Sequence, residues 1–422
     1  MVTPVRIGRY ELHDEIALGG MAAVHLGRFY GSAGFSRIVA IKRLHRHHAK
    51  DPDYVEMFLD EANLAARVRH ANVVTISDVV ATDEELFLVM DYIPGMTVAQ
   101  LCRALGNDEP LPAAIAMRIA GDALQGLHAV HTATDDEGQP LDIVHRDVSP
   151  ENLLVGVDGV TRVIDFGVAK GRGRVHRTRT GVMKGKLAYV SPEQILGEQL
   201  DCRTDLYSMG VTIWRMFAGA LPVDGDADVA LMHRKVTGEL PRLSSRATVA
   251  AGFDAAVARA TMRHREERFE SAIAMHTALL ADGPAPASTH AVAQWVATIA
   301  GGELGKRADR VTCILDMPEV TATTQTMPAR RSASRRSTAT LALIVVAATA
   351  AIVVGVRSAD HDRALEATSF AAGLPSVTLP VEHAPIAEPS AAASASTIPR
   401  AQRPAPVDRA KPKVPDRLLG RD

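Results

Sequence analysis

The stretch VHRDVSPENLLVGVDGVTRVIDFG, residues 144–167, gathers polar side chains around two short apolar runs. The runs cover residues 153–155 and 160–164, and the dipeptide Asp158-Gly159 between them is a strong signal for a tight turn. Two such runs around a turn predict an antiparallel β-hairpin. The polar residues that precede and follow the hairpin would then meet at its open end.

Three of these polar residues carry side-chain oxygens that could do chemistry. Asn152 precedes the first run, Asp165 follows the second, and Asp147 lies just upstream. Hard oxygen ligands suit Mg²⁺, which usually shares its coordination shell with substrate phosphates. A further carboxylate is then available to accept a proton from a hydroxyl group. The loop therefore combines a candidate magnesium site with a candidate base.

The chain of 422 residues has an ordinary globular composition, with 47% hydrophobic and 23% charged residues. This length allows roughly two or three domains. The formal net charge of -2 argues against a globally basic nucleic-acid-binding protein. Cys102, Cys202 and Cys313 lie far apart, which favours a reducing compartment over a disulfide framework. No apolar segment follows the first charges, so we expect no secretory signal peptide.

A small strand-rich part precedes a larger helical part. Short β-branched runs dominate from about Val24 to Leu101, with one helical pattern between them. After Leu111 the apolar periods are mainly helical, and Gly219 stands where one helix would end. The first helical pattern consists of Val55, Phe58, Leu59, Ala62, Ala65 and Val68. The second consists of Leu206, Met209, Gly210, Ile213, Trp214 and Phe217. The expected fold class is α+β with two lobes.

The order of these motifs resembles the protein-kinase family, in its bacterial serine/threonine (Hanks-type) branch. HRD followed by Asn152 is similar to the catalytic loop of the family, and DFG, residues 165–167, to its metal loop. The resemblance covers about residues 10–280 and implies the two-lobed kinase fold. It also implies that Asp147 orients and deprotonates the substrate hydroxyl, while Asn152 and Asp165 hold Mg²⁺.

Motifs further upstream imply a site for ATP. IVAIKRL resembles the strand with the phosphate-pairing lysine, Lys42, and Glu61 matches the acid that pairs with it. LVMDYIPG resembles the hinge, where Met90 would wall the adenine pocket and backbone groups of Asp91 and Ile93 would bind the base. The other residues that the resemblance places at the nucleotide are Ala17, Leu18, Gly19, Gly20, Val24, Ala40, Leu154 and Asp165.

The resemblance also implies two buried ionic contacts. Glu193 in SPEQ matches an acid that is buried against an arginine, and Arg268 matches that arginine. Asp205 matches an acid that caps the backbone of the catalytic loop. We expect both contacts to be structural, because loss of one partner would leave a buried charge uncompensated.

The loop that covers the nucleotide departs from the family pattern GxGxxG. This chain has Ala17, Gly19 and Ala22 at the three glycine positions, with Gly20 beside the middle one. An alanine with negative φ still presents its amide to a phosphate. We therefore expect a less flexible loop and a working site.

Ser149 and Lys186 form a second departure. Serine/threonine kinases of the family place a lysine where Ser149 stands and a threonine where Lys186 stands. We hypothesise that the hydroxyl and the ammonium have exchanged sides of one contact, so that Lys186 supplies positive charge at the γ-phosphate. The alternative is that Lys186 is one more charge in a basic segment.

That segment is KGRGRVHRTRTGVMKGK, residues 170–186. Thr178 or Thr180 is a candidate for autophosphorylation, and the phosphate would pair with Arg146 and its basic neighbours to order the loop. The alternative is an ordinary solvated loop.

Beyond Gly283 the composition shifts to Ala, Pro, Ser and Thr, apart from a helical stretch near residues 292–304. Residues 339–356 carry no charge and would span about 27 Å as a helix, enough for a bilayer core. A buried soluble helix is the alternative. Arginines concentrate before this stretch, which by the positive-inside rule keeps the N-terminal part in the cytoplasm. The expected parts are a kinase domain at 10–282 with lobes at about 10–93 and 94–282, a partly helical linker at 283–338, a transmembrane helix at 339–356 and a disordered extracytoplasmic tail at 357–422.

We therefore expect a single-pass kinase of the inner cell membrane that transfers the γ-phosphoryl group of ATP, with Mg²⁺, to protein hydroxyls. Its expected partners are protein substrates, the lipid bilayer and a second copy for trans-autophosphorylation, and no nucleic acid. The alternative is a pseudokinase, a module that binds nucleotide or partners without turnover, which the depleted glycine loop and Ser149 would support. The presence of Lys42, Glu61, Asp147, Asn152 and Asp165 favours the active enzyme.

Overall fold

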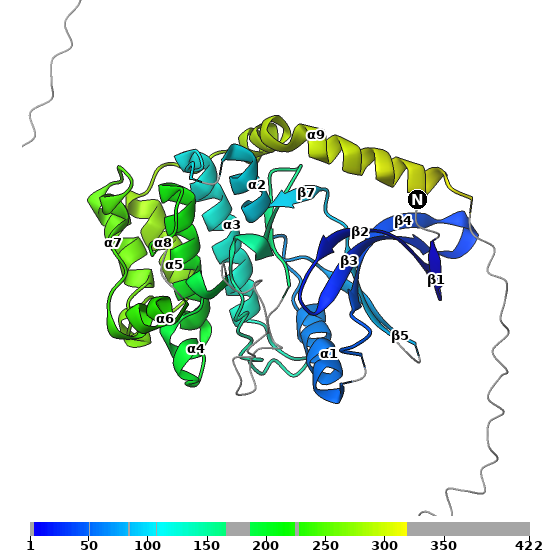
Figure 1. Ribbon diagram of the computed structural model, residues 1–422, viewed down its shortest axis with the longest axis horizontal. Helices are drawn as coiled ribbons and strands as arrows, with labels where there is room; N and C mark the ends of the chain where they lie inside the picture. The colour runs from blue at the N-terminus through cyan, green and yellow to red at the C-terminus, as the bar shows by residue number, and fades with distance from the viewer. Residues whose placement is uncertain are drawn as a thin grey trace, which may run out of the picture. The chain divides into compact units, whose positions relative to one another are not determined.

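The computed structural model describes residues 4–49, 51–82, 85–106, 108–165, 186–223 and 228–318. These residues form a strand-rich N-terminal lobe and a helical C-terminal lobe, which Figure 1 shows side by side. The predicted two-lobed α+β architecture is confirmed.

The N-terminal lobe is one antiparallel sheet with a helix against it. The sheet has the strand order β1-β2-β3-β4-β6-β5. Its strands are β1 (Val5–Ile7), β2 (Tyr10–Leu18), β3 (Ala22–Tyr30), β4 (Ser36–Leu44), β5 (Ile76–Ala81) and β6 (Leu86–Asp91). Helix α1 (Pro52–Arg67) begins at the N-cap Asp51, whose side chain accepts a hydrogen bond from the amide of Asp53. Its buried Phe58 and Ala62 pack with Ala40 and Met90 of the sheet.

The C-terminal lobe combines a small sheet with a helical core. Its strands are β7 (Gly95–Thr97), β8 (Leu153–Gly156) and β9 (Thr161–Val163). Its α-helices are α2 (Val98–Leu105), α3 (Ala113–His131), α4 (Pro192–Leu196), α5 (Cys202–Ala218), α6 (Asp228–Thr237), α7 (Ala251–Ala260), α8 (Ala272–Asp282) and α9 (Thr289–Asp316). The short 3-10 helices of the two lobes are η1 (Ser32–Gly34), η2 (Pro150–Asn152), η4 (Lys186–Ala188), η5 (Leu243–Ser245) and η6 (Arg265–Glu267).

The helical periods and the hairpin of the sequence are confirmed. Helix α5 covers the second predicted pattern and ends at Gly219, which has a left-handed φ of 72°. Strands β8 and β9 pair antiparallel with Leu153 opposite Val163. The sequence pattern does not predict β1 and β2, because both precede the β-branched runs that begin at about Val24.

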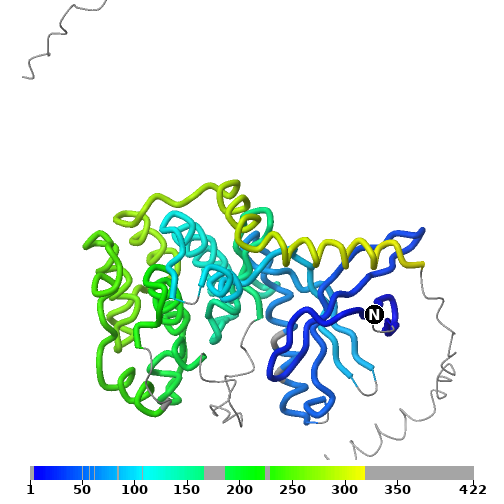
Figure 2. The backbone as a smooth tube through the Cα atoms, turned by 45° about the horizontal axis from the view of Figure 1, so that its top comes forward, coloured from blue at the N-terminus to red at the C-terminus, as the bar shows by residue number. Residues whose placement is uncertain are grey.

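Helix α9 is longer than the predicted stretch near 292–304. Its buried Val292, Val296 and Ala300 join the core of the C-terminal lobe, so this part of the predicted linker is packed protein. Figures 1 and 2 show that the helix continues from this lobe toward the strands of the other. Among the residues that the structure describes, no helix is long and apolar enough to cross a membrane. The predicted span at 339–356 and the tail at 357–422 lie outside those residues.

Two glycines that end helices allow the effect of a close approach to be separated from the effect of φ. Gly219 and Gly197 both have φ near 70°, but a Cβ at Gly219 would meet the carbonyl oxygen of Asp108 at 2.3 Å, whereas one at Gly197 would meet nothing within 4 Å. We expect Gly197→Ala to cost about 1 kcal/mol of unfolding free energy and Gly219→Ala clearly more. Denaturant unfolding of both variants measures this difference, and equal losses would contradict it.

Candidate active site

The buried carboxylate of Asp205 holds the backbone of the loop that carries Asp147. The amides of His145 and Arg146 each donate to Asp205, at 2.8 Å to Oδ2 and 2.8 Å to Oδ1. His131 contacts the same carboxylate at 2.7 Å from Nε2 to Oδ2. Burial alone would raise the pKa of Asp205, but the hydrogen bond from His131 and the nearby positive charge outweigh it, so the pKa lies below its ordinary value. The predicted backbone cap is confirmed.

Two residues of this region hold backbone conformations that non-glycine residues rarely adopt. Arg146 has a φ of 66° and Asp165 a φ of 55°. Such conformations persist only where surrounding contacts impose them, and they cluster at functional sites. Here the Asp205 contacts fix Arg146, and His145, fully buried, reaches the carbonyl of Ile164 at 3.1 Å through Nε2. The loop and the end of the hairpin are thereby joined.

The predicted polar residues converge on this point. Asn152 Nδ2 donates to the backbone oxygen of Asp147 at 2.7 Å and to its Oδ2 at 2.9 Å. Lys186 Nζ reaches the same Oδ2 at 2.9 Å. Lys42 Nζ contacts Asp165 Oδ1 at 3.0 Å. At the open end of the hairpin, the amide of Ile164 donates to the carbonyl of Asn152 at 3.0 Å, which brings Asp165 next to the loop.

These side chains fit the oxygen donor set that Mg²⁺ prefers. The side-chain nitrogen of Asn152 donates a hydrogen bond to Asp147, so Oδ1 is the atom of Asn152 that can face a cation. Asp165 pairs with Lys42 through Oδ1 and has a second carboxylate oxygen. An ion that keeps several waters and shares phosphate ligands needs only such a partial set from the protein.

Ser149 and Lys186 occupy contrasting environments. The side chain of Ser149 is buried, and its Oγ has no hydrogen-bond partner among the described residues. The Lys186 side chain is 40% exposed where it meets Asp147. Burial would lower the pKa of Lys186, but the Asp147 charge outweighs burial and raises it. The ammonium is thus charged at neutral pH and lies beside the candidate base.

The apolar residues predicted to line the adenine pocket pack into one cluster of the N-terminal lobe. Ala40 faces Met90 across strands β4 and β6, and Val24 and Ile93 pack against the same cluster. The amide of Asp91 donates to the carbonyl of Thr75 at 3.0 Å, so of the Asp91 backbone groups only the carbonyl oxygen is available to an adenine ring.

Leu154 belongs to the other lobe, where it faces Thr97 of β7. Ala17 faces Val24 across strands β2 and β3, and Leu18, next to the glycine turn, is 71% exposed. Gly19 closes that turn, with its amide donating to the carbonyl of Ala22 at 2.9 Å.

His45 supports this turn, a role that the sequence did not reveal. Its ring Nε2 lies 3.0 Å from the carbonyl of Gly19, and its amide donates to the carbonyl of Met21 at 3.0 Å. His45 thus fastens both sides of Gly20 to the end of β4. No periodic pattern marks this residue, because the contact depends on where two strands end.

Several predicted site residues lie outside the described part of the structure. They are Gly167 of the DFG motif, Thr178 and Thr180 of the basic segment, and the side chain of Glu61, whose backbone lies in α1.

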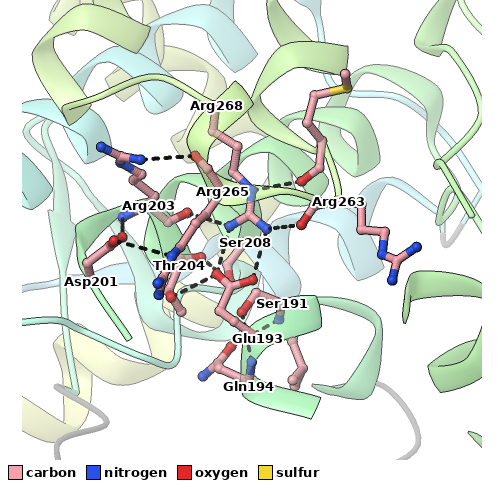
Figure 3. Close-up of polar contacts among 12 residues, drawn as sticks. Ser191, Glu193, Gln194, Asp201, Arg203, Thr204, Ser208, Arg263, Arg265 and Arg268 are labelled. Carbon is pink, nitrogen blue, oxygen red and sulfur yellow. Dashed lines mark hydrogen bonds and ion pairs between the residues drawn. The ribbon is translucent and has the colours of Figure 1, made fainter. Parts of the chain in front are cut away.

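The predicted pair of Glu193 and Arg268 is confirmed and is bidentate, at 2.7 and 2.9 Å (Figure 3). Thr204 Oγ1 also donates to Glu193, at 2.9 Å. Burial would raise the pKa of Glu193, but the Arg268 guanidinium lowers it below the ordinary value. The pair ties helix α4 to the segment before α8, and so fixes the chain that follows Lys186.

Lys235 is a second residue that the sequence did not reveal. Its side chain on α6 is buried, and Nζ donates to the carbonyls of Ala188 at 2.5 Å and Val190 at 2.7 Å. Ser208 Oγ donates to the intervening carbonyl of Tyr189 at 2.8 Å. Three consecutive carbonyls after Lys186 are therefore held by side chains. Burial lowers the pKa of Lys235 to about 7, against the opposing effect of Glu193.

Comparison with known proteins gives a consistent result. Residues 10–277 match the family described as protein kinase domain. The tyrosine-protein kinase MasK of Myxococcus xanthus is 38% identical over 276 residues, which are 64% of this chain and 42% of that protein. The serine/threonine-protein kinase PksC of Streptomyces coelicolor is 36% identical over 64% of this chain and 48% of its own length. This chain thus spans less than half the length of these relatives.

Among solved structures, the Mycobacterium tuberculosis PknI kinase domain has a TM-score of 0.51 and 25% sequence identity. The alignment covers 66% of this chain and 98% of that domain. Helix α9 begins beyond the residues that the family match covers.

Lys235 makes stability depend on pH in a defined direction. An unfolded lysine titrates near pH 10.4, whereas the folded one titrates at about 7, so between these values the unfolded chain binds more protons. The stability of the wild type should therefore rise with pH relative to Lys235→Met, by up to about 1.4 kcal/mol per pH unit above pH 7. Unfolding of both proteins from pH 6 to 9 measures the difference, and a constant or falling difference would refute it.

Proposed function

This chain belongs to the protein kinase family, and from that premise we propose that it is a serine/threonine protein kinase that transfers the γ-phosphoryl group of ATP to protein hydroxyls. The observation that carries the proposal is the convergence of Asp147, Asn152, Lys186 and the Lys42–Asp165 pair. In phosphoryl transfer, positioning and charge stabilisation supply most of the rate enhancement.

Each side chain has a definite task in this proposal. Asp147 orients the acceptor hydroxyl and takes its proton, and its contacts with Asn152 and Lys186 fix its direction. Lys42 binds phosphate oxygens. Asn152 and Asp165 hold Mg²⁺, which, when bound, neutralises charge on the phosphate oxygens. Glu61, on the helix beside the sheet, pairs with Lys42 once nucleotide is bound.

The base of ATP would lie in the apolar cluster of Val24, Ala40 and Met90, against Leu154 from the opposite lobe. Asp91 would contribute its carbonyl and Ile93 its backbone. The turn from Ala17 to Gly20, fastened by His45, would cover the phosphates.

The acceptor is proposed to be serine or threonine, by similarity to the relatives named serine/threonine-protein kinases. MasK is named a tyrosine-protein kinase, so phosphoamino-acid analysis is needed to decide between the acceptors. The proposal extends to autophosphorylation of Thr178 or Thr180 between two copies of the chain. It also extends to anchoring in the inner membrane through residues 339–356, with the kinase domain at 10–282 in the cytoplasm. These two extensions are supported by sequence alone.

Replacement of the proposed base tests catalysis. Asp147→Asn keeps the size of the side chain but removes the proton acceptor, so phosphoryl transfer to a generic protein substrate should fall by about 10²- to 10⁴-fold while MgADP still binds. Asp142→Asn, at an exposed position just upstream, is the matched control. Equal labelling by wild type and Asp147→Asn would favour the alternative, a scaffold that binds nucleotide without turnover.

The proposed exchange between Ser149 and Lys186 has its own test. Lys186→Thr should lower kcat by about 10²- to 10³-fold, the usual effect of removing one group that stabilises transition-state charge. Adding Ser149→Lys should restore much of the loss, because it returns an ammonium to the same contact from the other side. Arg246→Thr, which removes a positive charge at an exposed position of the C-terminal lobe, is the control. A double variant no faster than Lys186→Thr would exclude the exchange.

A further inference from the structure

Helix α9 carries one continuous inward stripe that crosses from one lobe to the other. The stripe repeats every three or four residues, the period of one helix face. Its members are Val292, Val296, Ala300, Leu304, Arg307, Val311 and Ile314. The helix has 28 residues and is therefore about 42 Å long, long enough to contact both lobes.

The first half of α9 is fixed to the C-terminal lobe. Val292, Val296 and Ala300 are buried in its core. A Cβ at Gly159, in the hairpin turn, would meet the carbonyl of Thr289 at 1.9 Å, so the start of the helix lies directly on that turn.

The middle of α9 contacts the chain that joins the lobes. Arg307 Nη1 donates to the carbonyl of Gly95 at 3.0 Å. Gly95 begins β7, two residues after Ile93 of the proposed base-binding segment. The side chain of Arg307 is 17% exposed, so this contact is largely shielded from water.

The far end of α9 is bound to the N-terminal lobe by Arg28 of β3. Nη1 of Arg28 donates to the carbonyl of Ile314 at 2.9 Å and to that of Met317 at 2.6 Å. The last carbonyls of a helix have no partner within it, and a cation there also suits the helix dipole. Arg28 is itself held over the ring of Tyr30, whose hydroxyl donates to the buried Glu11 at 2.6 Å.

The two ends of α9 differ in how tightly they pack. Beside the far end, a cavity of about 770 Å³ lies between the helix and β2, with Glu15 on the strand and Arg310 on the helix among its lining residues. Ile314 is 4% exposed, but its neighbour Leu315 is 40% exposed. The attachment to the N-terminal lobe thus rests on fewer buried residues than the attachment to the C-terminal lobe.

We propose that the half of α9 from Leu304 to Ile314 is a positioning element of the nucleotide site: it fixes the N-terminal sheet and the hinge relative to the C-terminal lobe. Residues of both lobes must contact one nucleotide. When the angle between the lobes is already fixed, nucleotide binding does not have to restrict the motion of the lobes, so it costs less free energy. The effect on nucleotide rests on the proposed function, whereas the docking of the helix does not.

Two substitutions in the full chain test this inference. Ile314→Asp puts a charge on the docked face, and Leu315→Asp puts the same charge on the exposed face of the same turn. Hydrogen exchange without nucleotide should rise at residues 303–317 in Ile314→Asp alone, with residues 289–300 unchanged. The Kd for MgADP should increase at least about fivefold in Ile314→Asp, the lower range of a coupling between sites, and stay at the wild-type value in Leu315→Asp.

Arg28→Met provides the same test from the other side of the contact and should reproduce both effects. If Ile314→Asp and Leu315→Asp show the same hydrogen exchange at residues 303–317 and the same Kd for MgADP, α9 does not position the lobe and the inference is overturned. If the two variants differ in hydrogen exchange but neither the wild type nor any variant binds MgADP, the docking of α9 is upheld and only the proposed function fails.

Discussion

The buried carboxylate of Asp205 is the contact on which the geometry of the site depends. It accepts the amides of two successive residues, His145 and Arg146, and His131 lies against one of its oxygens. These contacts hold Arg146 at a φ of 66°, which a non-glycine residue adopts only when its neighbours impose it. The direction of the next residue, Asp147, follows from that backbone. A base directed by a buried, fully paired acid does not need to be ordered at the moment of reaction.

The segment that carries Lys186 is fixed by a different device. Asp205 binds amides, whereas Lys235 and Ser208 bind three consecutive carbonyls, and the Glu193–Arg268 pair fixes the turn that follows. Removing one partner of such a buried pair typically costs about 3 to 5 kcal/mol. Lys186 and Asp147 thus approach each other from two anchored segments, which a hydrogen bond from Gln194 Nε2 to the carbonyl of Arg146 also joins, at 2.9 Å. Their 2.9 Å contact depends on both anchors.

The sequence predicted those parts of the fold that depend on local pattern. The hairpin from Leu153 to Val163 and helix α5 follow from turn residues and apolar period, and both are observed. Strand β2 was missed because Glu11 and His13 are polar and yet buried, so its alternation is hidden. The burial of Glu11 depends on Arg28 and Tyr30, which only the pairing of β2 with β3 brings next to it. Lys235 and His45 were missed for the same reason, since each binds backbone carbonyls that only the folded chain brings near.

The limit of local pattern also explains why the sequence predicts a linker where α9 lies. A stripe of Val292, Val296 and Ala300 predicts a helix but does not reveal which surface it covers. The polar residues further along the helix look like a solvated face, although Arg307 reaches the hinge carbonyl of Gly95 and the terminal carbonyls meet Arg28. The helix is docked at one end by several buried apolar residues and at the other by Ile314 and a few polar contacts, so its attachments are unequal. The weaker attachment lies on the lobe that covers the proposed nucleotide site, and the chain beyond residue 318 continues from that same end. Loss of the weaker attachment would therefore affect the N-terminal sheet first, and the core of the C-terminal lobe would keep its packing.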